Sequence, residues 1–496
     1  MIRILPQTDL DCDVLVVGSG PAGASAAYHL AEAGWDVLMI DRQAFPRDKT
    51  CGDFVSPVSQ RELGRIDINL SERGVGNVIR RAALHLNGEQ LVSRLIPQTP
   101  GLVVPRLALD AMIADAASSA GARAHHGLRC TGYEWEDDCV VVSAIGRNRI
   151  RHFRARVLIG ADGANSAVAR VLRGRAPLHG SRIMAIRAYY TGVQGPSDRA
   201  DLFFTTESFP GYCWLFPTGP LTANVGVGMA ADTVPKTGQH LANLLRSLVA
   251  DEPALRERLC RAQMTGRVAG WPLTTYRPTE QLVGDRVLLV GDAAGLVNPL
   301  NGEGIQNALQ SGRWAAEVVN SCSQDCDFAA ADLAAYPVRV RKELRYDMAL
   351  ANLIIQLIRN RALGSLWLRV LRGIADRARA DAVAAEIAGG ILAGVVPASR
   401  AASVSLAGGV LEQMALSAGM DLVAGALSGP ARLAGMGAKG VGQIAGMVAD
   451  VLSDPAGFAA WSIHLGEAAA EFSGQALAHG LLGDILNELK GKRAER

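Results

Sequence analysis

The sequence predicts an α/β protein in which a nucleotide-binding domain is combined with a mixed-sheet domain and a C-terminal helical region. A glycine-rich loop, Gly18 to Gly23, follows an apolar run near the N-terminus, and a second glycine-centred segment, Gly291-Asp292, follows another apolar run far along the chain. Beyond residue 340 the sequence becomes basic, with helical apolar spacing. A chain of 496 residues with 49% hydrophobic residues suits one multi-lobed unit or two to three domains.

The segment from Asp13 to Asp41 has the pattern strand, loop, helix, strand. The apolar run 14–17 predicts the first strand, the helix begins near Pro21, and the run 37–40 predicts a second strand that ends at Asp41. This order, with a glycine-rich loop after the first strand, is typical of a Rossmann-like unit.

The glycines of the first loop have separate tasks. Gly18 makes the tight turn, Gly20 lets the backbone approach a pyrophosphate, and Gly23 lets helix and strand pack closely. The helix begins near Pro21 and Ala22. The free N–H groups of its first turn, with the positive end of the helix dipole, stabilise phosphates. The loop therefore predicts a bound dinucleotide.

The acidic residue at the end of the second strand narrows the choice of nucleotide. Asp41 is placed to accept hydrogen bonds from a ribose diol, and its charge would repel a 2′-phosphate. FAD or NAD therefore fits better than NADP. The adjacent Arg42 belongs to the same candidate cofactor site.

The second glycine segment predicts the other end of the same cofactor. The strand 287–290 delivers Gly291-Asp292, whose carboxylate suits a ribityl hydroxyl or the pyrophosphate neighbourhood. Gly302 and Gly304 then shape a loop that opens a helix at Ile305. The helix start would point at the flavin pyrimidine edge, where negative charge collects on reduction. Two such loops in this order predict one FAD, with AMP at the first and ribityl-flavin at the second.

Two further polar residues lie between these motifs. Asp162-Gly163 follows the strand 155–159, and this tight turn would aim a carboxylate into the cofactor groove. Arg106 precedes a helix predicted over Leu107–Ala120 and is a candidate clamp for the pyrophosphate or flavin. A surface arginine near a helix start is the alternative interpretation.

Together these residues resemble the geranylgeranyl reductase family, within the larger group of flavoproteins built like para-hydroxybenzoate hydroxylase. The match covers about residues 10 to 400, and four segments carry it: residues 18–23, 49–53, 212–217 and 291–305. The resemblance implies an FAD domain beside a smaller sheet domain, with the substrate cavity between them. It also implies reduction of isolated C=C bonds in prenyl chains, with reduced FAD as the hydride donor. The tryptophan-x-tryptophan-x-isoleucine-proline signature of the related flavin-dependent halogenases does not occur in the sequence.

The predicted strand around residue 214 carries alternating aromatics. Tyr212, Trp214 and Phe216 share one face, whereas Cys213 and Leu215 take the other. The resemblance implies that the three aromatics line the substrate cavity. From the residues alone, the same row could pack against a long apolar substrate or against the protein's own helices.

The segment 49–53 forms a loop that could reach the flavin, and it includes Gly52 as a candidate cofactor contact. Its Cys51 has three interpretations: a plain buried thiol, a shaper of the flavin pocket, or a proton donor. No catalytic dyad is evident in the sequence. Catalysis would then rest on positioning and a dry cavity.

The predicted domains interleave along the chain. The FAD-binding domain takes residues 10–68, 102–180 and 281–340, and the substrate-binding sheet domain takes 69–101 and 181–280. A helical closure follows over 341–400, and an Ala/Gly-rich helical extension over 401–496. The basic amphipathic stretch near residues 340–379 would either close the cavity or lie on a membrane surface.

Composition excludes several classes of function. The net charge of +2 shows no excess of basic residues of the kind that nucleic-acid-binding proteins carry. The eight cysteines are scattered without a CxxC pair, which favours a reducing compartment and no structural metal. We find neither a signal peptide nor an apolar stretch of about 18 residues or more. We therefore expect a cytoplasmic protein, with a peripheral membrane contact left open and no indication of oligomeric state.

The leading functional hypothesis is an FAD-dependent ene-reductase acting on a prenyl-like or other long unsaturated substrate. Because only one nucleotide-binding motif is visible, electrons would come from transiently bound NAD(P)H or from a redox partner protein such as ferredoxin. The alternative is a flavin-dependent monooxygenase or oxidase that tailors a secondary metabolite and shares every cofactor motif. A non-catalytic prenyl-lipid carrier, on a scaffold like that of the Rab escort and GDI proteins, is a third hypothesis. The intact Gly291-Asp292 segment argues against it.

Overall fold

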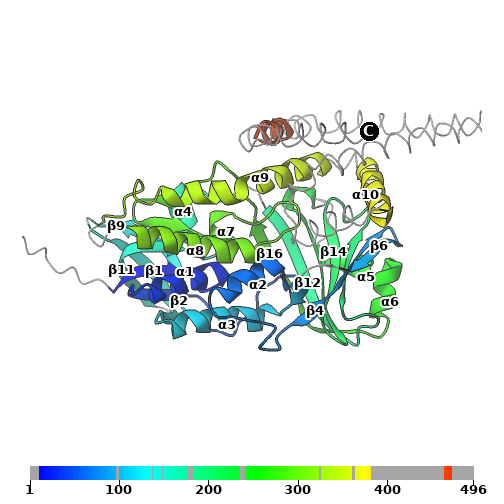
Figure 1. The fold of residues 1–496 in the computed structure, drawn as a ribbon, viewed down its shortest axis with the longest axis horizontal. Helices are drawn as coiled ribbons and strands as arrows, with labels where there is room; N and C mark the ends of the chain where they lie inside the picture. The colour runs from blue at the N-terminus through cyan, green and yellow to red at the C-terminus, as the bar shows by residue number, and fades with distance from the viewer. Residues whose placement is uncertain are drawn as a thin grey trace, which may run out of the picture.

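The computed structural model describes residues 11–95, 100–136, 138–147, 149–176, 182–234, 241–322, 326–359, 364–380 and 463–471. In these residues two large sheets lie end to end, and helices cover both (Figure 1). The extension predicted over 401–496 lies outside the described residues, apart from 463–471, which is helical.

The first large sheet holds the predicted nucleotide-binding unit. Its strands follow the order β17-β18-β11-β1-β2-β8, and β10 pairs antiparallel with β11 and with β9. The bounds are β1 (Cys12–Val17), β2 (Val37–Asp41), β8 (Arg123–His126), β9 (Arg129–Trp135), β10 (Val140–Gly146), β11 (Arg149–Gly160), β17 (Val283–Gly284) and β18 (Val287–Leu289). Because β1 runs parallel to β2 and β11, and β11 parallel to β18, the loops that follow these strands meet at one edge of the sheet.

Helices α1 (Pro21–Glu32), α3 (Arg106–Ser119) and α8 (Ile305–Ser321) pack together on this sheet, with α1 between the other two (Figure 1). Helix α1 begins at Pro21 and α8 at Ile305, where the sequence predicts them. Proline suits the first helical position because its fixed φ is already helical and its missing N–H is not needed there. The short α7 (Gly291–Ala294) leads from β18 toward α8.

The second large sheet is mixed, as predicted, because β5 and β13 pair in parallel while its other pairs are antiparallel. Its order is β16-β12-β15-β14-β13-β5-β6. The bounds are β5 (Arg81–Leu86), β6 (Glu89–Leu95), β12 (Arg182–Thr191), β13 (Arg199–Phe204), β14 (Tyr212–Gly219), β15 (Thr222–Ala230) and β16 (Gln263–Thr274). One face packs on α5 (Leu241–Asp251) and α6 (Pro253–Leu259), and the short η2 (Ala231–Thr233) follows β15.

A small third sheet was not predicted from the sequence. It consists of β3 (Phe54–Val55), β7 (Gly101–Val103) and β4 (Asn77–Ile79), in that order. Helix α2 (Pro57–Gly64) follows β3, and α4 (Ala167–Arg173) follows β11. The third sheet packs against β14 of the second large sheet.

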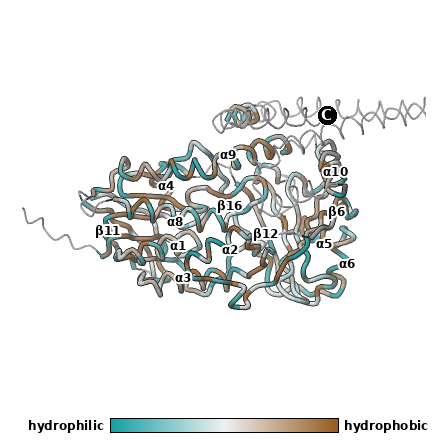
Figure 2. The backbone as a smooth tube through the Cα atoms, viewed as in Figure 1, coloured by the Kyte–Doolittle hydropathy of each residue, from teal (hydrophilic) through white to brown (hydrophobic). Residues whose placement is uncertain are grey.

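The basic stretch beyond residue 335 forms two helices, α9 (Ala335–Ile358) and α10 (Gly364–Ala380). Helix α9 lies along α8, and hydrophilic residues of its first half give way to a mostly hydrophobic second half (Figure 2). Helix α10 lies against β6, where Arg372 and Arg379 both pair with Glu89. Across the described segments, we find no helix that combines the length and the apolar character needed to cross a bilayer.

Candidate active site

A cavity of about 1340 Å³ is lined by residues of both large sheets. Pockets for single small ligands typically measure about 300–1,000 Å³, so this cavity has room for a cofactor and a second molecule. Cys51 and all but two of the other site residues predicted from the sequence line it. The exceptions are Gly23 and Gly291, which serve packing: a Cβ on Gly23 would overlap the carbonyl oxygen of Gly18, and one on Gly291 would lie 2.8 Å from the Cβ of Ala22.

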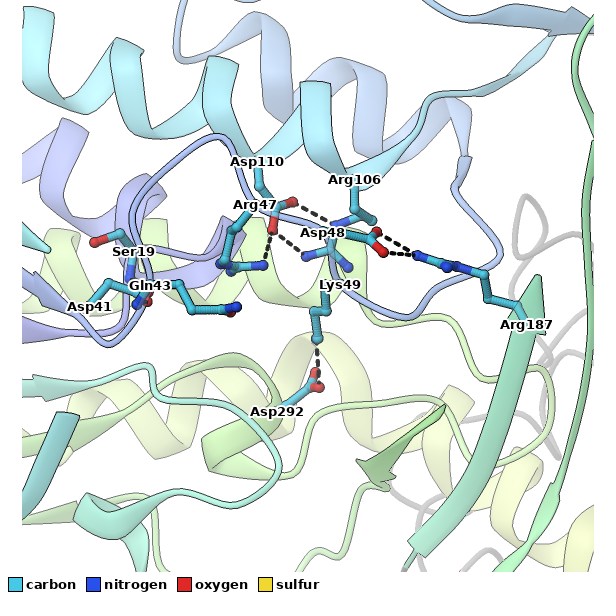
Figure 3. A network of polar contacts seen from close by, with 10 residues as sticks. All are labelled: Ser19, Asp41, Gln43, Arg47, Asp48, Lys49, Arg106, Asp110, Arg187 and Asp292. Carbon is cyan, nitrogen blue, oxygen red and sulfur yellow. Dashed lines mark hydrogen bonds and ion pairs between the residues drawn. The ribbon is translucent and has the colours of Figure 1, made fainter. Parts of the chain in front are cut away.

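The first glycine loop forms one end of the cavity. Gly18 has φ +102°, in the region that favours glycine. The carboxylate of Asp41 is fixed beside this loop, because Oδ2 accepts from the backbone N–H of Ser19 and Oδ1 from that of Gln43, both at 2.9 Å (Figure 3). Asp41 is buried and lines the cavity beside the loop, and its role in binding a ribose stays a prediction.

Two helix N-termini open onto the cavity without side-chain caps. These are α1 at Gly20 and α8 at Gly304. By contrast, the N-termini of α2 and α4 are capped by the hydroxyls of Ser56 and Ser166. The N–H groups at the start of α1 therefore remain available for anionic or polar groups of a ligand, whereas at the start of α8 the N–H of Gln306 already donates to the carboxyl group of Glu303. This backbone arrangement fits a flavin dinucleotide held at both ends.

Asp162 is also used as a helix cap. Its Oδ2 accepts from the backbone N–H of Ala167 at 2.6 Å, and its Oδ1 accepts from the hydroxyl of Ser166. The sequence suggested a carboxylate aimed into the cofactor groove. Instead the carboxylate turns to the start of α4, where the backbone N–H of Ala167 and the hydroxyl of Ser166 donate to it. Burial also raises the pKa of Asp162.

Arg106 is buried at the start of α3 rather than exposed at the surface. Its Nε and Nη2 donate to Asp110 at 2.6 and 2.8 Å, and Arg47 also pairs with Asp110 at 3.0 Å (Figure 3). Two guanidinium groups thus share one fully buried carboxylate, and both arginines line the cavity. The cluster therefore carries a net positive charge on the wall of the cavity. Sequence reasoning missed Arg47 and Asp110.

At the second glycine segment, Asp292 pairs with Lys49, with 3.2 Å between Nζ and Oδ2. A Cβ on Gly304 would lie 3.5 Å from Asp292 Oδ1, so the two predicted residues are neighbours. Gly302 has φ +73° and lets the loop turn toward α8. Near the other end, the guanidinium of Arg42 stacks 4.9 Å from the ring centroid of Trp271.

Glu303 is a titratable group that sequence reasoning missed. It lines the cavity immediately before α8, and its carboxyl group accepts hydrogen bonds from the hydroxyls of Ser56 and Ser59 and from the backbone N–H of Gln306. Burial raises the pKa of Glu303 to about 8, although these hydrogen bonds oppose the shift. Its carboxyl group is therefore mainly protonated at neutral pH.

The far end of the cavity is apolar and aromatic. Tyr212, Trp214 and Phe216 line it from β14, with successive ring centroids 6.1 and 6.2 Å apart. Cys213 and Leu215 are fully buried on the opposite face, against α5 and α6, so the alternation is as predicted. Small residues complete this wall: Ala82, Ala83, Ala185, Ala200, Gly228, Ala375 and Ala378.

Cys51 lies where the two ends of the cavity meet. Burial raises the pKa of its thiol, which therefore stays protonated. Its neighbour Gly52 faces the aromatic wall, because a Cβ there would lie 3.1 Å from the ring of Phe216. Asp53, the next residue, is fully buried, and burial raises its pKa to about 6.

Comparisons with known proteins agree with this geometry. Residues 11–316 match the family model described as the FAD binding domain. The chain is 34% identical over 345 residues to digeranylgeranylglycerophospholipid reductase 2 of Methanopyrus kandleri, covering 67% of this chain and 83% of that protein. It is 35% identical over 329 residues to the menaquinone reductase of Mycobacterium tuberculosis, covering 64% of this chain and 78% of the relative.

Among solved structures, a geranylgeranyl bacteriochlorophyll reductase-like protein from Thermoplasma acidophilum has the same fold. It matches with a TM-score of 0.64 and 23% identity over 82% of this chain and 96% of its own.

Proposed function

The chain belongs to the FAD-binding-domain family and is an FAD-dependent oxidoreductase, and from this premise we propose that it reduces C=C bonds of a long isoprenoid substrate. The observation that carries the proposal is the continuity of the cavity. One space connects the glycine loops and uncapped helix starts with a wall of aromatic and small apolar side chains. The names of the reductases from Methanopyrus kandleri and Mycobacterium tuberculosis support an isoprenoid substrate.

Each end of the cavity has its own role in this reaction. FAD, when bound and reduced, supplies the hydride. The start of α1 and the Arg47–Arg106 cluster would bind the pyrophosphate, and Asp41 would orient the ribose. The start of α8 would hold the pyrimidine side of the ring. Tyr212, Trp214 and Phe216 orient the substrate chain and exclude water.

Positioning supplies most of the catalysis, because an isolated alkene has no carbonyl group to polarise. The bound flavin would supply the hydride for one alkene carbon, and water or the protonated thiol of Cys51 would supply the proton for the other. The apolar wall keeps the alkene against the flavin site and keeps bulk water away from it.

Two further features belong to the proposal. Electrons reach the flavin from NAD(P)H or from a protein donor of the ferredoxin type, and the rate of flavin reduction by each donor under anaerobic conditions distinguishes them.

Because isoprenoid lipids reside in membranes, we also propose a peripheral membrane contact through the basic α9 and α10. Flotation of the protein with anionic vesicles checks that contact.

The decisive experiment uses the purified holoprotein. It should contain one FAD per chain, and after anaerobic chemical reduction it should convert a prenylated quinone or a digeranylgeranyl glycerophospholipid to a product heavier by two hydrogens. Mass spectrometry of the extracted lipid measures this gain. Reoxidation without any gain in lipid mass would overturn the proposal, and oxygen-dependent hydroxylation would assign the protein to the monooxygenases instead.

A further inference from the structure

A short loop, residues 47–53, crosses the cavity between the two large sheets. We call it the strap. Its first three side chains pair with three different elements: Arg47 with Asp110 of α3, Asp48 with Arg187 of β12, and Lys49 with Asp292 of α7 (Figure 3). The strap is therefore tied to both sides of the cavity, because α3 and α7 belong to the cofactor side and β12 to the substrate side.

The second half of the strap is held by one side chain, Asn224 of β15. Its Nδ2 donates to the carbonyl oxygen of Cys51 and to Oδ2 of Asp53, both at 2.7 Å. Its Oδ1 accepts from Nε1 of Trp214 at 3.0 Å. Asn224 has no exposed surface, and both hydrogens of its amide group are used.

The turn that Asn224 holds is conformationally demanding. Asp53 has φ +64°, which is uncommon for a residue with a side chain. Its Oδ2 also accepts from the hydroxyl of Tyr189 at 2.6 Å, so two neighbouring strands hold the same carboxylate. Gly52 lies directly against the aromatic wall, 3.1 Å from Phe216 and 3.5 Å from Trp214 Nε1 as measured from an added Cβ.

We propose that Asn224 is a positioning residue, which fixes the indole of Trp214 and the Cys51–Gly52 turn in one arrangement and so aligns the substrate wall with the cofactor end of the cavity. An amide is required there because the site presents two acceptors, on Cys51 and Asp53, and one donor, on Trp214. Aspartate would lack both donors, and serine would be too short to reach all three partners. The effect on turnover rests on the proposed function, whereas the effect on the strap does not.

The first test measures how accessible the strap is to a reagent, and it does not depend on enzyme activity. The holoprotein is treated with N-ethylmaleimide, and the modification of each cysteine is followed by mass spectrometry. In Asn224→Ser, Cys51 should react about tenfold faster than in the wild type, the change expected when roughly one hydrogen bond no longer opposes local opening. Cys213 reports global opening, because it is fully buried on the other face of the same sheet. Its rate should rise no more than it does in the matched control variant described next.

Asn77→Ser is the matched control. Asn77 also donates two hydrogen bonds from Nδ2, to the carbonyl oxygens of Ser197 at 2.6 Å and Pro217 at 3.0 Å, but it does not contact the strap. This variant should lose similar stability and leave the rate at Cys51 as in the wild type. Asn224→Asp keeps the acceptor for Trp214 and loses both donors to the strap, so it should resemble Asn224→Ser.

The second test measures turnover. Asn224→Ser should lower kcat about tenfold while KM and the affinity for FAD change little, because the bound molecules lose alignment rather than contacts. An unchanged rate at Cys51, or a rise at Cys51 no larger than in Asn77→Ser, would overturn the positioning role. If the wild type reduces no isoprenoid, the proposed function fails, and the labelling experiment still decides the role of Asn224.

Discussion

The two ends of the cavity are built from different parts of the chain. The cofactor end depends largely on backbone, although charged side chains also line it: a glycine has φ +102°, two helix starts lack a cap from the N-cap side chain, and Asp41 is held by two backbone N–H groups. The substrate end is formed by side chains, three aromatics on β14 and small residues around them. A backbone site tolerates few residue types at fixed positions, whereas a side-chain wall can be made in many ways. The sequence of the cofactor end therefore identifies its ligand, whereas the sequence of the substrate end indicates only a class of ligand.

The largest effect should come from the backbone end. Gly23→Val should abolish FAD binding and lower the yield of folded protein, because the added side chain meets the carbonyl oxygen of Gly18 and the helix cannot keep its distance from β1. Overpacking typically costs about 1–3 kcal/mol and more where backbone must move. Flavin absorbance per chain and the melting temperature measure the result.

Gly64→Ala is the control for this substitution. Nothing lies within 4 Å of an added Cβ at Gly64, at the end of α2, so FAD content should be unchanged there. If the Gly23→Val protein folds and still binds FAD, the cofactor end does not depend on backbone in the way described here.

At the side-chain end, Trp214→Leu should reduce kcat/KM about 10- to 100-fold, the equivalent of a large buried aromatic contact. FAD content should change little, because Trp214 belongs to the wall and not to the glycine loops. Steady-state kinetics and flavin absorbance give the two values. In Trp135→Leu, a half-exposed tryptophan outside the cavity is changed, and both values should match the wild type. Loss of FAD before loss of turnover would mean that β14 supports the cofactor instead.

A substitution of Asp292 should have a smaller effect on FAD binding than Gly23→Val. Asp292→Ala should weaken FAD binding about tenfold, because it removes an acceptor beside the start of α8 and leaves Lys49 without its partner. Titration of the apoprotein with FAD measures the affinity. Asp36→Ala, which removes an exposed ion pair with Arg123, should bind FAD as the wild type does. Equal affinities for all three proteins would remove Asp292 from the cofactor site.

The smallest effect concerns Glu303. Burial raises its pKa from 4.5 to about 8, so the carboxylate form is the costly one in the folded protein. The wild type should therefore lose stability relative to Glu303→Gln as the pH rises from about 4.5 to about 8, and the difference should then level off. We expect a change in melting temperature of about 2–4 °C. The exposed Glu72→Gln should show no such trend, and a pH-independent difference for Glu303→Gln would contradict the assignment.

The contrast also explains what could be predicted from the sequence. The glycine loops, the start of α8 at Ile305 and the alternation on β14 follow from local spacing. Arg47, Asp110 and Asn224 do not, because their roles depend on which strands and helices become neighbours. Asn224 did give one signal, as the single amide in the apolar run 223–229. The third sheet was missed because its strands are only two or three residues long.

The order of strands along the chain has a consequence for engineering. The chain contributes β1 and β2 to the first large sheet, β5 and β6 to the second, β8 to β11 to the first, β12 to β16 to the second, and finally β17 and β18 to the first. Neither sheet can therefore be excised by a single cut or exchanged with a homologue as one cassette. Heating should then unfold both together in one cooperative transition, and a proteolytic nick in either sheet should release the flavin from both.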